Sequence, residues 1–226
     1  METLFLEPYT ILLIAGFIGF FMAFGIGAND VANSMGTSVG SRAITIKQAI
    51  IIAAIFEFLG AFLAGGEVTS TIRKGIVDPE LYVDETNIFV IGMLSALLAG
   101  GTWLYVASLR GWPVSTTHTI VGSIVGFVLI TKGVDAVSWG KVGNIAMSWV
   151  TSPLFSGTLA FGLYISAKKL ILDRSNPGEA AIRYIPFYSF LVAVVISLVT
   201  ARKGLKHVGV EFTDNEVYLF IAIFSS

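Results

Sequence analysis

The sequence contains no cysteine and few charged residues. Its 226 residues include 14 Lys or Arg and 15 Asp or Glu, which leaves a net charge of −1. The absence of cysteine excludes disulfides and thiolate metal sites, and the near-neutral charge argues against a nucleic-acid partner. Hydrophobic residues make up 55% of the chain and the mean hydropathy is +0.82. A soluble domain must cover its surface with polar residues, so this composition predicts an integral membrane protein.

Long apolar runs recur along the chain, at about 10–28, 44–66, 87–109, 114–130, 142–166 and 186–201. Because a helix needs about 20 residues to cross the hydrocarbon core, most runs are long enough, although 114–130 is marginal and 186–201 is short. They predict an all-α, polytopic transmembrane helical bundle. Glycine recurs inside the runs, and we interpret most of these positions as helix-packing contacts. They are Gly16, Gly19, Gly25, Gly27, Gly60, Gly122 and Gly126.

The loops predict the orientation, because Lys and Arg concentrate on the cytoplasmic side. The loop 167–185 is rich in Lys and Arg and is placed inside, together with the turn that holds Arg42 and Lys47. The acidic amino terminus and the loop 67–86 then lie outside. Residues 87–130 must begin and end on the outer side, which two full spans or a re-entrant hairpin would both satisfy.

A polar stretch closes the first apolar run and reads Gly25-Ile26-Gly27-Ala28-Asn29-Asp30-Val31-Ala32-Asn33-Ser34. A continuous helix over 10–41 would be about 48 Å long and would exceed the bilayer core, so we predict a broken first helix. Broken helices expose backbone groups to ions. The Asp30 carboxylate and the neutral oxygens of Asn29, Asn33 and Ser34 suit a small hard cation, and Asp30 with Asn29 is the predicted Na⁺ site. The alternative is a polar helix cap at the interface.

A second polar stretch opens the run 114–130 and reads Trp112-Pro113-Val114-Ser115-Thr116-Thr117-His118-Thr119. Proline fits the first turn of a helix, and a helix amino terminus attracts anions through its free N–H groups and its dipole. The hydroxyls of Ser115, Thr116 and Thr117 suit a tetrahedral oxyanion, although an ordinary Ser/Thr cap has the same pattern. His118 can donate to the anion or relay a proton, or serve as a structural hydrogen-bonding residue.

Glu57 is the one charged residue between Lys47 and Glu67. An isolated carboxylate at the bilayer centre costs about 2.5–3.5 kcal/mol on insertion scales, so such residues are usually functional. Glu57 is therefore a candidate cation ligand or proton carrier. The alternative is a protonated Glu that is hydrogen-bonded between helices.

The stretch 27–34 resembles the signature of the PiT family of inorganic phosphate transporters, the sodium–phosphate symporter type. Four further stretches are similar to the same family in the same order: Phe56-Glu57, Thr71-Ile72-Arg73-Lys74-Gly75-Ile76, Pro113-Val114-Ser115-Thr116-Thr117-His118 and Ser148-Trp149-Val150-Thr151-Ser152-Pro153. The resemblance implies two inverted repeats and phosphate symport with Na⁺ or H⁺ by alternating access, with no other cofactor. It implies a plasma (inner) membrane location.

Carried over by residue, the resemblance puts Asn29, Asp30 and Asn33 in the ion and phosphate centre. It puts Ser115, Thr116 and Thr117 at the tip of a re-entrant hairpin that holds phosphate, and it matches Glu57 to an acidic residue needed for transport. Ser34 and His118 join the predicted coupling residues. The resemblance favours the hairpin for residues 87–130.

The signature occurs once, whereas family members carry it once in each repeat. We therefore predict one half of an inverted-repeat transporter, with residues 1–201 as the amino-terminal repeat and 202–226 as a loop and the truncated start of the next segment. A second repeat or a homo-oligomer would complete the site. The alternatives are a permease for sulfate or another tetrahedral oxyanion, and a non-transporting half-protein or fragment. An enzyme is not expected, because no nucleotide-binding loop, metal-ligand cluster or hydrolase frame is recognisable in the sequence.

Overall fold

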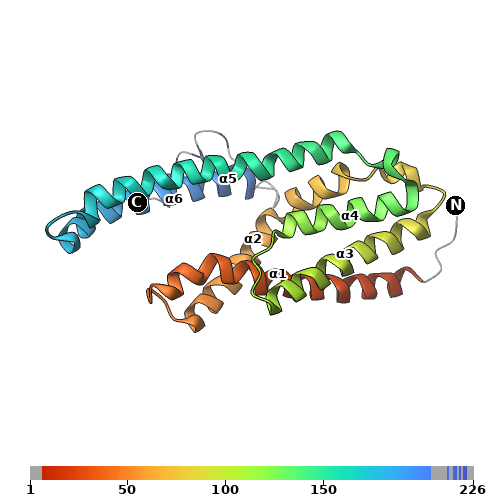
Figure 1. Cartoon of the computed structure of the whole chain (residues 1–226), viewed down its shortest axis with the longest axis horizontal. Coiled ribbons are helices and arrows are strands. Elements are labelled where there is room, and N and C mark those ends of the chain that lie inside the picture. The colour runs from red at the N-terminus through yellow and green to blue at the C-terminus, as the bar shows by residue number, and fades with distance from the viewer. Residues whose placement is uncertain (1–6, 205–212, 214–215, 218, 220, 223–226) are drawn as a thin grey trace. The chain divides into compact units, whose positions relative to one another are not determined.

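The computed structural model describes residues 7–204, 213, 216–217, 219 and 221–222, with the backbone alone at 64, 66–75, 203 and 204. This part of the chain is helical and contains no strand, which confirms the all-α prediction. The α-helices among these described residues are α1 (Pro8–Gly40), α2 (Ile46–Gly75), α3 (Thr86–Leu109), α4 (Thr116–Lys132), α5 (Trp139–Ala167) and α6 (Pro177–Val199), and Figure 1 labels each of them. Most of the predicted tail 202–226 and the side chains of residues 71–75 lie outside the described residues.

The helices belong to two compact units. One comprises Met1–Phe58 with Ser70–Val142, and the other comprises Leu59–Thr69 with Gly143–Ser226. In the second unit a hydrogen bond of 2.6 Å joins Ser166 Oγ of α5 to the Tyr188 hydroxyl of α6. The short run predicted at 186–201 is part of a longer helix, because α6 begins at Pro177 behind an Asn176 cap. Its polar first turns had concealed this start.

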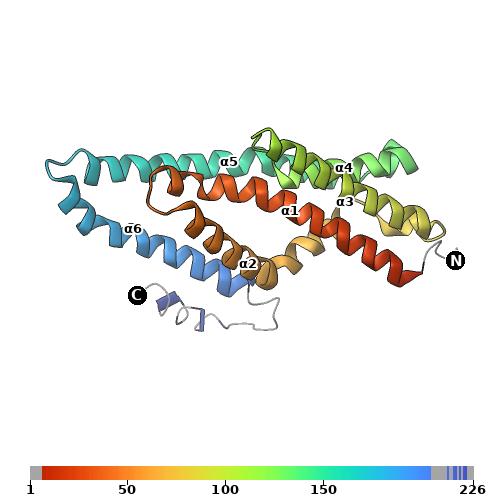
Figure 2. The same cartoon turned by 90° about the horizontal axis from the view of Figure 1, so that it is seen from below.

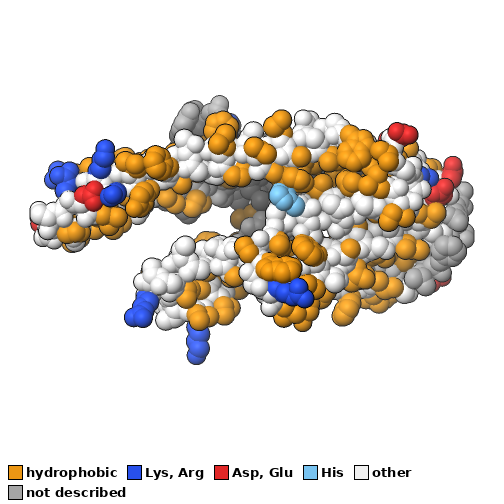
Figure 3. Space-filling model, in the orientation of Figure 1, with side chains coloured by type: hydrophobic (Ala, Val, Ile, Leu, Met, Phe, Trp, Pro, Cys, Tyr) orange, Lys and Arg blue, Asp and Glu red, His pale blue; other side chains and the backbone are white. Residues whose placement is uncertain are grey.

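The surface of the helices suits an apolar solvent. Five segments are long and apolar enough to cross a membrane, namely Pro8–Gly40, Ile46–Leu63, Thr86–Leu109, Trp139–Leu172 and Pro177–Arg202. Hydrophobic side chains cover much of the face in Figure 3, and the charged side chains gather near helix ends. Phe17 and Phe155, for example, are 76% and 75% exposed. Lipid solvates such side chains and water does not, so the fold is that of a multi-pass integral membrane protein.

Helices α1 and α3 run parallel and pack through small residues. A Cβ added to Gly25 would lie 3.1 Å from Leu104 Cβ, and one added to Gly101 would lie 3.0 Å from the ring of Phe21. Glycine at such positions lets two helix backbones approach closely. Residue numbers rise together along the contact, so the two helices start at the same end of the unit.

Helix α4 turns back along α3 to form an antiparallel hairpin. At its open end Lys132 Nζ lies 2.8 Å from Glu85 Oε2, and the Tyr82 hydroxyl lies 2.6 Å from Thr131 Oγ1. Further along, a Cβ on Gly92 would overlap the ring of Phe127. The tip of the hairpin, residues 110–115, therefore lies far from the end at which α1 and α3 start.

The hairpin stops part-way along α1 (Figures 1 and 2). Its tip contacts Asn29, and α1 continues to Gly40, which adds about 16 Å at 1.5 Å per residue. The predicted break in the first helix is wrong, because α1 is one α-helix of 33 residues. The side chains of α1, and not an unwound stretch of its backbone, contact the hairpin. The helix tolerates its glycines because an interior glycine costs only about 1 kcal/mol relative to alanine.

Candidate functional site

The two predicted polar stretches meet where α1 passes the hairpin tip. Thr116 Oγ1 donates to Asp30 Oδ2 at 3.0 Å. Thr116 is the first residue of α4, and both side chains are half-buried. The contact joins residues that are 86 positions apart, so it is a product of the tertiary fold. It brings the candidate cation ligand and one candidate phosphate donor into one site.

Asn29 binds the backbone of the tip. Its Nδ2 donates to the Trp112 carbonyl at 2.9 Å, and its Oδ1 accepts from the Val114 N–H at 3.2 Å. A longer contact of 3.5 Å joins Nδ2 to Ser108 Oγ. Asn29 is only 5% exposed, which is typical of a polar side chain whose hydrogen bonds are satisfied within the protein.

The amino terminus of α4 presents the other predicted hydroxyls. Ser115 caps the helix, and its Oγ accepts from the His118 N–H at 3.3 Å. Ser115, Thr117 and His118 are all exposed. The positive end of the α4 dipole therefore faces the Asp30 carboxylate on one side and is open on the other, which is favourable for anions.

Glu57 of α2 lies beside Gly27 of α1, and Gly27 is about one helical turn before Asp30. A Cβ added to Gly27 would be 3.9 Å from Glu57 Oε2. The carboxylate is exposed within this unit, so it is open to a cation or a proton. The sequence thus identified an acidic residue that the fold places next to the signature helix.

The remaining two candidates on α1 are not joined to the tip. Asn33 and Ser34 are exposed, and the Ser34 hydroxyl donates to the Val31 carbonyl of its own helix at 3.3 Å. Within the residues that the structure describes, no hydrogen bond connects either one to Ser115, Thr116 or Thr117. Their predicted roles stay predictions.

Comparison with known proteins places this arrangement in a family. A family model described as the phosphate transporter family matches residues 26–225. The chain belongs to the phosphate transporter family. A Haemophilus influenzae protein named as a phosphate permease is 53% identical over 206 residues, covering 91% of this chain and 49% of its own length. The chloroplastic inorganic phosphate transporter 2-1 of Arabidopsis thaliana is 49% identical over 179 residues, covering 79% and 30%.

A solved structure also resembles the chain. It is titled "The sodium-dependent phosphate transporter", has 42% sequence identity and a TM-score of 0.83, and is matched over 96% of this chain and 52% of its own chain. The chain spans about half or less of the length of these relatives. Since the family consists of transporters, the finding agrees with the prediction that the chain is not an enzyme. The predicted resemblance to phosphate transporters is confirmed.

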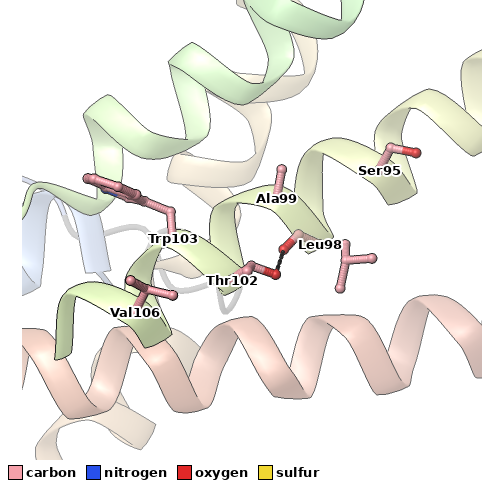
Figure 4. Close-up of a pocket in the computed structure, with 6 residues that line it drawn as sticks. All are labelled: Ser95, Leu98, Ala99, Thr102, Trp103 and Val106. Carbon is pink, nitrogen blue, oxygen red and sulfur yellow. Dashed lines mark hydrogen bonds between the residues drawn. The ribbon is translucent and has the colours of Figure 1, made fainter. Parts of the chain in front are cut away.

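A different feature of this phosphate transporter family member is an apolar depression on α3. It has a volume of about 550 Å³. Six residues of one helix face line it (Figure 4): Ser95, Leu98, Ala99, Thr102, Trp103 and Val106. The Thr102 hydroxyl donates to the Leu98 carbonyl at 2.8 Å. Its proton is therefore already hydrogen-bonded and is not offered to an anion. The depression does not contain the predicted site residues.

Sequence reasoning found neither the hydrogen-bond partners of Asn29 nor the position of Glu57 beside Gly27. Gly27 appeared only as a packing position, and the carbonyl of Trp112 and the N–H of Val114 carry no side-chain signal. One clue was present in the sequence. Pro113 has no backbone N–H, so it cannot donate a hydrogen bond within the turn that it occupies. Within the described residues, no group of three or more His, Asp or Glu side chains is arranged to hold a metal ion. A Na⁺ site here would depend on one carboxylate and neutral oxygens.

Proposed function

We propose that this chain is the amino-terminal half of a transporter that moves inorganic phosphate across the plasma (inner) membrane together with Na⁺ or H⁺. The proposal depends on the 3.0 Å contact between Thr116 Oγ1 and Asp30 Oδ2. This contact brings one hydroxyl of the proposed anion site together with a carboxylate. Membership of the phosphate transporter family and the sodium-dependent relative support the choice of substrate and ion.

Electrostatic repulsion between phosphate and Asp30 is the reason why phosphate transport would be coupled to a cation. Two unit charges 4 Å apart interact by about 4 kcal/mol at an effective dielectric of 20. A phosphate ion at the α4 amino terminus would be repelled by Asp30 on this scale. A cation bound at Asp30 removes the repulsion, so the cation binds first and phosphate second. Glu57, beside Gly27, is a further place for a cation or proton.

The hairpin provides the anion donors. Ser115 and Thr117 are exposed at the first turn of α4, where N–H groups are unpaired by the helix. Hydroxyl and amide donors at a helix amino terminus match the oxygens of a phosphate ion. Asn33 and Ser34, one turn beyond Asp30, would complete the site from the α1 side.

The arrangement of α1, α3 and α4 supports a re-entrant hairpin. With 17 residues, α4 is short for a span, and the tip stops level with Asn29 while α1 continues. Parallel packing of α1 and α3 puts both helix starts on one side, which we propose is the outside. Alternating access then requires the second repeat, supplied by the rest of a longer chain or by a second subunit.

A flux measurement tests the proposed function. Proteoliposomes carrying the complete transporter should accumulate labelled phosphate when a Na⁺ or a pH gradient is imposed. The gradient that drives uptake identifies the coupling ion. Excess unlabelled phosphate should compete and sulfate should not. Residues 1–226 alone are expected to give no flux until the second repeat is added. Flux that no ion gradient stimulates would contradict coupling.

Replacing Thr116 by Val should weaken phosphate uptake by about tenfold. Valine keeps the branched shape but removes the donor to Asp30, and a hydrogen bond to a charged group contributes about 1.5–3 kcal/mol. Thr116→Ser keeps the hydroxyl and is the matched control, expected near wild-type uptake. Initial rates over a range of Na⁺ concentrations measure the effect. Equal uptake by both variants would exclude the Thr116 hydroxyl from the site.

A further inference from the structure

The Asn29 side chain matches the two backbone groups that flank Pro113. Its amide nitrogen donates to the carbonyl of Trp112, and its oxygen accepts from the N–H of Val114. One side chain therefore pairs one donor and one acceptor of the tip, as a neighbouring strand would. The partners lie 83 and 85 residues away in sequence.

The tip has no other way to pair these two groups within its own turn. The Trp112 N–H is directed back to the Ala107 carbonyl at 2.9 Å, which closes the end of α3. Pro113 has no N–H to offer, and α4 begins only at Thr116. A polar backbone group that loses contact with water and is left unpaired destabilises the fold. The Asn29 amide removes that cost at both groups.

Two neighbouring residues of α1 hold two nearby residues of the hairpin. Asn29 binds the Val114 N–H, and Asp30 accepts from the Thr116 hydroxyl. A shift of the tip would separate the second pair as well as the first. The Asn29 contacts therefore fix where the α4 amino terminus stands relative to the Asp30 carboxylate.

We infer that Asn29 is a positioning residue that clamps the hairpin tip onto α1, and that its amide serves the tip backbone in place of a coupling cation. The inference rests on the proposed function for its consequence, because the clamped tip is the proposed phosphate site. It replaces the sequence-based prediction that Asn29 is a Na⁺ ligand. The clamp itself is defined by hydrogen bonds and is measurable without transport.

The clamp and the cation ligand differ in what they require of the side chain. A clamp needs a donor and an acceptor together, which an amide has and an ionised carboxylate lacks. A protonated carboxyl group has both again. Asn29→Asp should therefore release the tip when ionised and hold it when protonated. As a cation ligand, Asp would instead be most effective in its ionised form.

The test uses a nitroxide attached to Thr117→Cys in the otherwise cysteine-free chain. Its mobility is recorded by electron paramagnetic resonance in lipid at about pH 8 and about pH 3, on either side of the ordinary Asp pKa of about 3.9. Asn29→Asp should give a mobile spectrum at the higher pH and the wild-type spectrum at the lower one. Asn29→Ala should be mobile at both. Asn144→Asp, an exposed position on α5, is the matched control and should resemble wild-type at both.

A wild-type spectrum for Asn29→Asp at both pH values would overturn the clamp, and so would a mobile spectrum at both. A second measurement needs no spin label. Amide hydrogen exchange at Val114 should be slow in the wild-type chain and about fivefold faster in Asn29→Ala, since one hydrogen bond contributes about 1 kcal/mol. Fast exchange at Val114 in wild-type also overturns the clamp. Neither readout depends on phosphate flux, so a failed transport assay leaves the clamp result intact.

Discussion

Replacing Asp30 by Asn should lower cation-dependent phosphate uptake by the complete transporter about a hundredfold or more. The change keeps the shape of the side chain and an oxygen that accepts from Thr116, but it removes the charge that would hold the cation. An ion pair at 4 Å contributes about 4 kcal/mol at an effective dielectric of 20, which exceeds the loss of any one neutral contact. Uptake of labelled phosphate in proteoliposomes, with and without the ion gradient, measures the effect.

The matched control for this experiment is Asp135→Asn. Asp135 is an exposed carboxylate in the short turn Val134–Ala136 after α4, in the same unit but at the opposite end of α4 from the hairpin tip. It should retain wild-type uptake. Both variants should elute as wild-type from a sizing column, because neither removes a packing contact. Undiminished uptake in Asp30→Asn would remove this carboxylate from the mechanism and with it the proposed order of binding.

The helices were predictable because they follow from local chemistry, whereas the meeting of the two polar stretches was expected only on the hypothesis that both serve one site. Apolar runs predict spans directly, and a Ser/Thr cluster after proline predicts a helix start. The contact between Asp30 and Thr116 follows if both stretches serve one ion site. The break in α1 was predicted from length alone, which fails because a helix longer than the bilayer core can tilt. The hydrogen bonds of Asn29 could not be predicted from the sequence, because its partners are backbone groups of residues far along the chain.

The glycines also show which features local sequence predicts and which depend on the tertiary fold. Of the positions interpreted as packing contacts, Gly25 has a close neighbour and Gly27 lies near Glu57, whereas the other five have no atom within 4 Å of a built Cβ in the described part of the chain. The tightest position, Gly92, was not singled out. Its sequence context resembles that of any membrane helix, and only the register of α3 against α4 brings a phenylalanine ring onto it.

Replacing Gly92 by Ala should destabilise the hairpin more than any other single methyl group added to α3 or α4. The new Cβ would overlap the ring of Phe127, and that ring is held in place by Tyr82, with centroids 5.4 Å apart, and by Phe89 at 6.5 Å. Overpacking of this kind costs about 1–3 kcal/mol. The thermal midpoint of the chain in lipid or detergent, followed by circular dichroism, should fall by several degrees.

Two further variants separate overpacking from a general effect of alanine. Gly126→Ala adds the same methyl group to α4, where nothing lies within 4 Å, and should leave the midpoint unchanged or raise it, because alanine favours helix by about 1 kcal/mol over glycine. Combining Gly92→Ala with Phe127→Leu removes the overlapping ring atoms and should recover part of the loss. If Gly92→Ala alone matched Gly126→Ala, the two helices would have to pack in a different register. The Lys132–Glu85 ion pair and the tip contacts to α1 would then be displaced along with the ring, because all three are set by one alignment of α3 with α4.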